Sequence, residues 1–95
     1  MKEFVEYTKP IDKTTIERKG AGELFPVTVD GDEYLVRAYF LPSGDDGRIL
    51  GKVSIYKPLG NDMYKTYICQ DFKGDLSNCE NDENSFQNLI RNSLY

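Results

Sequence analysis

The sequence contains no histidine and no tryptophan, and its only two cysteines are Cys69 and Cys79. Without an imidazole, Ser-His and Cys-His activation of a nucleophile is excluded, as is every metal site that needs a histidine. Two cysteines cannot complete a structural zinc site, and these two do not form the Cys-x-x-Cys motif of redox proteins. We therefore expect no metal, no cofactor and no catalytic residues, with a histidine-free enzyme that uses carboxylates as an alternative.

Long apolar runs are also missing. No stretch approaches the run of about 18 apolar residues that a membrane helix needs. Residues 1–6 lack the apolar segment of a signal peptide. We expect a cytoplasmic protein without a membrane span, in which Cys69 and Cys79 stay unbridged because that compartment is reducing.

The sequence has fewer basic than acidic residues. The 12 basic residues are outnumbered by 16 acidic ones, which gives a formal net charge of −4. Such a balance disfavours non-specific binding to nucleic acid or to anionic membranes, although it allows a local basic patch. A protein is therefore the expected partner, nucleic acid is disfavoured, and a homodimer is left open.

What the sequence does contain indicates β-structure. Its 95 residues suit a single domain, 1–95. Aromatic and β-branched residues concentrate in segments that predict four strands, at 24–29, 33–41, 48–57 and 63–71. Turn signals separate them: Asp30-Gly31, which readily adopts positive φ, and the stretches 42–47 and 58–62. Short connections of this kind favour an antiparallel meander.

The C-terminal segment has a different period. Phe86, Leu89, Ile90 and Leu94 recur at the spacing of an amphipathic helix, with Asn81 or Asp82 as its N-cap. Because the apolar stripe must be buried, we expect this helix to pack on one face of the sheet. The predicted fold is thus α+β, with four to five strands and one C-terminal helix.

The first 23 residues leave alternatives open. Residues 4–7 suit a fifth strand, whereas 14–18 suit either a strand or one helical turn. The Gly20-Ala21-Gly22 segment is interpreted as a flexible joint or turn, since a third glycine of a dinucleotide-binding motif is missing.

A candidate binding surface follows from the alternation of the strands. If Ile49, Val53 and Ile55 face the helix, the opposite face is open and carries interleaved aromatic and cationic side chains: Arg37, Tyr39, Lys52, Tyr56, Lys65 and Tyr67. Aromatic side chains beside cations can anchor a protein partner or stack on nucleic-acid bases. The same residue types are also ordinary on a solvated sheet face, where cross-strand pairs stabilise the sheet itself.

The sequence does not specify a biochemical function. The interpretation that fits it best is a small non-enzymatic protein-binding module, accessory or inhibitory, that acts through surface complementarity. A nucleic-acid-binding domain that uses the open sheet face is the second interpretation, and the carboxylate enzyme is the third.

Overall fold

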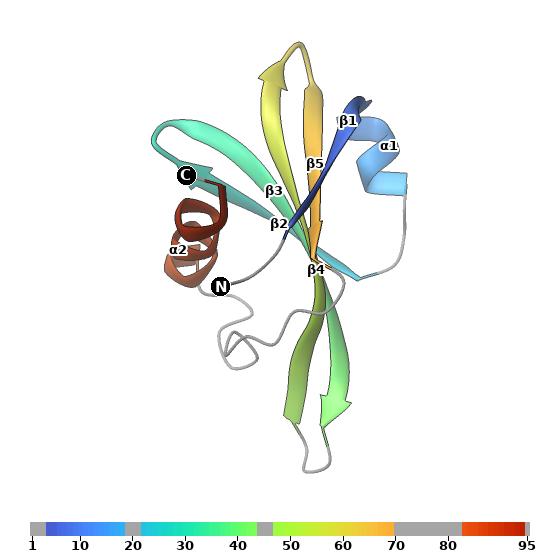
Figure 1. Ribbon diagram of the computed structural model, residues 1–95, viewed down its shortest axis with the longest axis vertical. Coiled ribbons are helices and arrows are strands. Elements are labelled where there is room, and N and C mark those ends of the chain that lie inside the picture. Colours follow the sequence, from blue (N-terminus) through green and yellow to red (C-terminus); the bar gives the residue numbers. More distant parts are fainter. Residues whose placement is uncertain (1–3, 19–21, 44–46, 70–82, 95) are drawn as a thin grey trace.

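The computed structural model describes residues 4–18, 22–43, 47–69 and 83–94. They form a five-stranded antiparallel sheet and two helices (Figure 1). In chain order the elements are β1 (Val5–Asp12), α1 (Lys13–Arg18), β2 (Glu23–Val29), β3 (Asp32–Ser43), β4 (Gly47–Gly60), β5 (Met63–Cys69) and α2 (Glu83–Leu94). The strand order is β1-β5-β4-β3-β2, so β2 to β5 are a meander and β1 adds to its far edge. The predicted α+β fold is confirmed, with five strands.

Two tight turns connect the strands of the meander. Asp30 and Gly31 have φ values of 52° and 89°, so both central residues of the β2–β3 turn adopt positive φ, as the Asp-Gly pair predicts. Asn61 and Asp62, at 55° and 59°, make a turn of the same kind between β4 and β5. This turn is shorter than the predicted 58–62 because β4 continues to Gly60, with a register irregularity after Pro58. A proline is tolerated at such a bulge because its missing N–H breaks no regular ladder bond.

One face of the sheet, which we call the α2 face, packs against the C-terminal helix. Phe86, Leu89 and Ile90 are buried against a cluster on β2 to β5 that comprises Val27, Val29, Tyr34, Val36, Ala38, Val53, Ile55 and Cys69. The rings of Phe25 and Phe86 stack with centroids 5.1 Å apart. The predicted apolar stripe of the helix is therefore confirmed, whereas its predicted N-cap residues lie outside the described part of the chain.

Polar contacts tie α2 to the β2–β3 hairpin. The Gln87 side chain donates a hydrogen bond of 2.7 Å from Nε2 to the Thr28 carbonyl oxygen. Arg91 lies 3.6 Å from the Asp30 carboxylate. Both contacts orient a helix whose attachment depends mainly on apolar burial.

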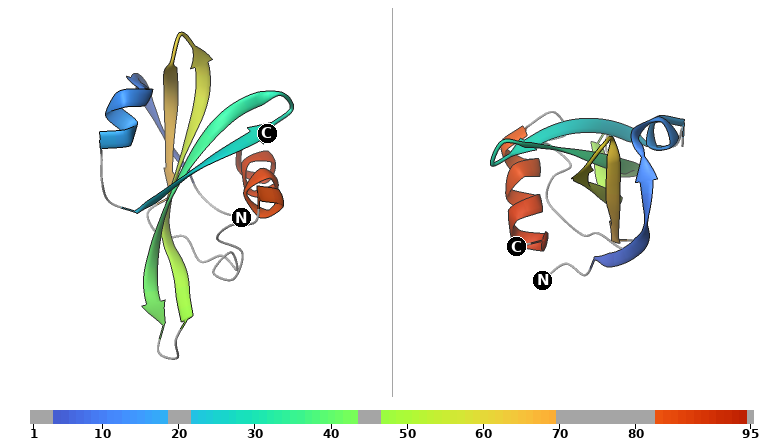
Figure 2. Two further views of the ribbon diagram at one scale, coloured as in Figure 1. Left: turned by 180° about the vertical axis from the view of Figure 1, so that it is seen from behind. Right: turned by 90° about the horizontal axis from the view of Figure 1, so that it is seen from above.

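The opposite face, which we call the α1 face, is covered by the N-terminal segment. Ile16 of α1 is fully buried in a second cluster with Leu35, Tyr56 and Tyr64, flanked by Ile11 and Leu24. Figure 2 shows α1 and α2 at opposite sides of the molecule. Of the two alternatives left open for residues 14–18, the helix is correct.

Two hydrogen bonds fix the start of α1. The Thr15 backbone N–H donates to Asp12 Oδ1 at 3.0 Å, which makes Asp12 the N-cap. The Lys13 N–H donates to the Asp62 carbonyl oxygen at 3.0 Å and so connects the helix to the β4–β5 turn. A helix of six residues is too short to be stable alone, so this cap and the burial of Ile16 hold it in place.

The chain enters β2 through a glycine that the packing requires. Gly22 has a φ of 82°, and a Cβ atom there would lie 2.7 Å from the Ala38 carbonyl oxygen. The predicted flexible joint is therefore closely packed at Gly22, while residues 20 and 21 lie outside the described residues.

The paired ends of β3 and β4 extend beyond the other strands (Figure 1). Their last pair is Ser43 with Gly47, whereas β2 begins opposite Ala38 and β5 ends opposite Val53. The predicted loop 42–47 is shorter at both ends, because strand pairing continues through Ser43 and resumes at Gly47.

Truncating the α2 stripe tests the packing of the helix. Ile90→Ala should lower the free energy of unfolding by about 2–4 kcal/mol because it leaves a cavity between α2 and the sheet. Asn92→Ala, at an exposed position of the same helix, should change it by less than about 0.5 kcal/mol. Urea unfolding measures both, and equal effects would show that the stripe is not buried.

Glycine substitutions test the close packing at the start of β2. Gly22→Ala should cost about 2–3 kcal/mol, because both its positive φ and the clash with Ala38 oppose a side chain. Gly31→Ala meets no atom within 4 Å and shares only the unfavourable φ, so about 1 kcal/mol is expected. Thermal or urea unfolding of the two variants separates the steric effect from the effect of positive φ. A Gly22→Ala variant as stable as Gly31→Ala would contradict the close packing of Gly22 against Ala38.

Candidate functional site

The six residues predicted to share an open face are divided between the two faces of the sheet. Tyr39 pairs with Lys52, and Arg37 pairs with Ser54, which places them on the α1 face together with Tyr56. On β5, however, Tyr67 pairs with Ile55 and therefore lies on the α2 face, as does Lys65. The prediction of a single surface is wrong because the alternation of β5 was assigned one residue out of register, which exchanges its two faces.

Two of the predicted residues are buried. Arg37 and Tyr56 have only 3% and 1% of their surface exposed. The Arg37 guanidinium donates a hydrogen bond to the Ile16 carbonyl oxygen, and Tyr56 belongs to the cluster around Ile16. Helix α1 covers this part of the face that was expected to be exposed. Arg37 and Tyr56 therefore contact α1 instead of solvent.

Tyr39 and Lys52 remain partly exposed on the α1 face. Lys52 Nζ lies 4.8 Å from the centre of the Tyr39 ring, a cation–π arrangement. Burial raises the pKa of the Tyr39 phenol above its ordinary value of 10.0. The pair is thus the part of the predicted surface that stays accessible on the α1 face.

On the α2 face, Lys65 and Tyr67 are engaged with β1. Glu6 Oε1 lies 2.8 Å from Lys65 Nζ and accepts a hydrogen bond of 3.1 Å from the Tyr67 hydroxyl. The hydrogen bonds from Lys65 and Tyr67 lower the pKa of Glu6, and the bond to Glu6 raises the pKa of Lys65. This network joins the edge strand to the sheet, and it pairs the Lys65 charge with a carboxylate.

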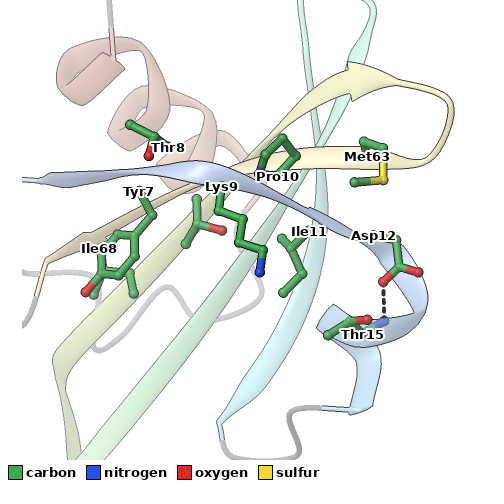
Figure 3. A pocket seen from close by; sticks show the side chains of 10 residues that line it. Tyr7, Thr8, Lys9, Pro10, Ile11, Asp12, Thr15, Met63 and Ile68 are labelled. Atoms are coloured by element: carbon green, nitrogen blue, oxygen red, sulfur yellow. Dashed lines mark hydrogen bonds between the residues drawn. The ribbon is translucent and has the colours of Figure 1, made fainter.

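A groove runs along β1, an edge strand of the sheet (Figure 3). Its volume is about 670 Å³, and its lining combines a run of β1 with residues of α1 and β5: Tyr7, Thr8, Lys9, Pro10, Ile11, Asp12, Thr15, Met63, Thr66 and Ile68. Figure 3 shows Tyr7, Lys9 and Ile11 on one side of β1, with Thr8 and Pro10 on the other. Tyr7 is 47% exposed, whereas Thr66 is buried and Ile68 is half-buried.

The two charged side chains of the groove differ in whether they are already engaged within the protein. Its lining holds one cation, Lys9, and one carboxylate, Asp12. Hydrogen bonds from the Thr15 side chain and backbone hold the pKa of Asp12 below its ordinary value, and that carboxylate caps α1. Lys9 is therefore the charge that a bound molecule would meet.

The sequence reasoning missed this groove because it assigned no residue of β1 to a site. A signal was present: Val5, Tyr7, Lys9 and Ile11 alternate with polar residues and a proline, as in an edge strand. That pattern indicates a strand but not its neighbour, and the groove exists only because β1 pairs with β5 and leads directly into α1.

The described residues show neither a metal-binding cluster nor a membrane helix. No three His, Cys, Asp or Glu side chains among them gather into a group that would hold a metal ion. Neither helix in this part of the chain is long and apolar enough to cross a membrane. Cys69 is a buried free thiol, and Cys79 lies outside the described residues.

The network around Glu6 predicts a pH-dependent contribution to stability. Because the folded pKa of Glu6 lies below its ordinary value of 4.5, the stability that Glu6 contributes is complete above that pH and is lost as pH falls through the lower folded pKa. Glu6→Gln should therefore unfold at a lower urea concentration than wild type at pH 7, and the two midpoints should converge as the pH falls below the folded pKa of Glu6. Glu17→Gln, at an exposed position of α1, is the control. A Glu6→Gln gap that persists unchanged at low pH would contradict the ion pair.

Comparison with known proteins adds no further information to this geometry. No family model, no curated protein and no solved structure matches the chain. The interpretation of the site therefore depends on the residues of this chain alone.

Proposed function

We propose that this protein is a small non-enzymatic protein-binding module that holds a segment of its partner in the groove along β1. The observation that carries the proposal is the groove itself, whose lining includes an exposed aromatic side chain, Tyr7, and the half-buried Ile68. Binding energy at protein interfaces concentrates in a few such anchors, and tyrosine is enriched among them. Mixed apolar and polar lining of this kind also provides orientation through a small number of polar groups.

The remaining predicted residues contribute unequally to this proposal. Tyr39 and Lys52 lie on the same face as Tyr7 and are partly exposed, so they extend the proposed surface beyond the groove. Lys65 and Tyr67 lie on the other face, and Arg37 and Tyr56 are buried. We therefore assign the contact to β1 and its surroundings and not to the surface expected from the sequence.

The nucleic-acid alternative gains no support from this geometry. Phosphate binding needs several cations on one surface. Of the cations expected together, Arg37 is buried under α1 and Lys65 is paired with Glu6 on the opposite face. A cytoplasmic location remains part of the proposal.

A selected peptide tests the proposal. Random heptapeptides displayed on phage should yield binders to the wild-type protein, and Tyr7→Ala should weaken their affinity about tenfold or more by removing the anchor. Leu59→Ala is the matched control, because Leu59 is a similarly exposed apolar residue (50%) near the end of β4 that does not line the groove. Affinities are measured by fluorescence polarisation.

Three outcomes would overturn the proposal. They are the failure of any peptide to be selected, binding that Tyr7→Ala leaves unchanged, and micromolar, salt-sensitive binding to mixed single-stranded RNA or DNA. The last outcome would favour the nucleic-acid alternative, since phosphate contacts make affinity fall with salt.

A further inference from the structure

We infer that the occupant of the groove is an extended, acidic peptide segment that places a carboxylate at Lys9 and an apolar side chain beside Tyr7. The inference rests on the proposed function and specifies its ligand. It follows from three properties of the groove, which are its direction, its charge and the spacing of its side chains.

The direction of the groove favours an extended ligand. Its β1 wall is a run of consecutive residues from Tyr7 to Asp12. Strand residues advance about 3.3 Å each, so this wall is roughly 17–20 Å long. A volume of about 670 Å³ spread over that length suits a narrow chain of about five or six residues better than a compact molecule.

The charge of the groove favours an acidic ligand. Lys9 is exposed and lies on the same side of β1 as Tyr7 (Figure 3). The carboxylate of Asp12 is committed to the N-cap of α1 by the hydrogen bond from Thr15. A carboxylate on the ligand therefore meets an ammonium group at the middle of the wall, and a cationic ligand meets like charge there.

The spacing of Tyr7 and Lys9 sets the order of the ligand's side chains. The two residues are separated by one position on β1, and in an extended chain such residues point to the same side. A ligand that runs alongside β1 matches them with an apolar residue and an acidic residue that are also separated by one position. Ile11 and Ile68 add further apolar surface to the groove.

The structure favours side-chain recognition over addition of the ligand as a sixth strand. Pro10 has no N–H to donate, and the β1–β5 register shifts between Tyr7 and Ile11. Proline and bulges are the features by which edge strands resist pairing with a further strand. The ligand is therefore selected by its side chains, which makes its sequence preference measurable.

A charge-reversal selection tests the inference. Random heptapeptides are selected in parallel against the wild-type protein, Lys9→Glu and Arg91→Glu. Arg91→Glu makes the same change of charge at an exposed position of α2, outside the groove lining, and serves as the control. Wild type and Arg91→Glu should both enrich Asp or Glu two residues along the chain from an apolar residue. Lys9→Glu should lose that preference and enrich Lys or Arg instead.

One synthetic peptide from the wild-type selection completes the test. Replacing its acidic residue by lysine should weaken binding to the wild-type protein about tenfold, and Lys9→Glu should restore much of the loss. Because Lys9 is exposed, the melting temperature of Lys9→Glu should match that of the wild type, which shows that the variant folds.

The two proposals fail in different ways. If the selected peptides lack acidic residues, or if Lys9→Glu keeps the wild-type preference, the inference about the ligand is wrong, while the proposed function stands as long as Tyr7→Ala still weakens binding. If binding depends on neither Tyr7 nor Lys9, both are wrong. Binding of RNA in place of peptides would overturn both as well.

Discussion

Both faces of the central strands are buried, and each is covered by another layer of the chain. Five consecutive residues of β3, from Tyr34 to Ala38, are buried, as are the residues of β4 from Val53 to Tyr56. A strand buried on two sides needs a layer on each side, and α2 provides only one of them. The second layer comes from the N-terminal segment, in which β1 crosses to the far edge of the sheet and α1 places Ile16 over Leu35 and Tyr56. The path of residues 4–18 follows from this requirement.

The candidate site forms because the N-terminal segment covers the α1 face only in part. The N-terminal segment is short, and α1 contributes a single fully buried residue, Ile16, to the core. The stretch of β1 that precedes α1 lies along β5 without being buried itself, and the groove forms there. Asp12 marks the boundary, since its carboxylate serves the helix while Lys9, three positions earlier, faces the groove. The structural role and the proposed ligand-binding role are thus divided along one strand.

The sequence was informative where local rules determine structure. The stripe of Phe86, Leu89 and Ile90 and the Asp30-Gly31 turn were predicted because helix period and positive φ are properties of neighbouring residues. The site was not predictable in the same way. On β5, Tyr64 and Thr66 alternate with Lys65 and Tyr67, and either set suits a half-buried face, so the alternation does not say which set points to the core. The burial of Arg37 depends on α1, whose position is fixed by contacts distant in the sequence.

The pairing of β1 with β5 joins residues that are far apart in the sequence, such as Val5 and Ile68. Closing so long a loop is entropically unfavourable, and β1 has few buried side chains to oppose its detachment. Any molecule that binds between β1 and its neighbours binds only the attached form. By mass action such a ligand shifts the equilibrium toward attachment. Occupancy of the groove and the docking of the N-terminal segment are therefore thermodynamically linked, so that a partner would also act as a clamp on the fold.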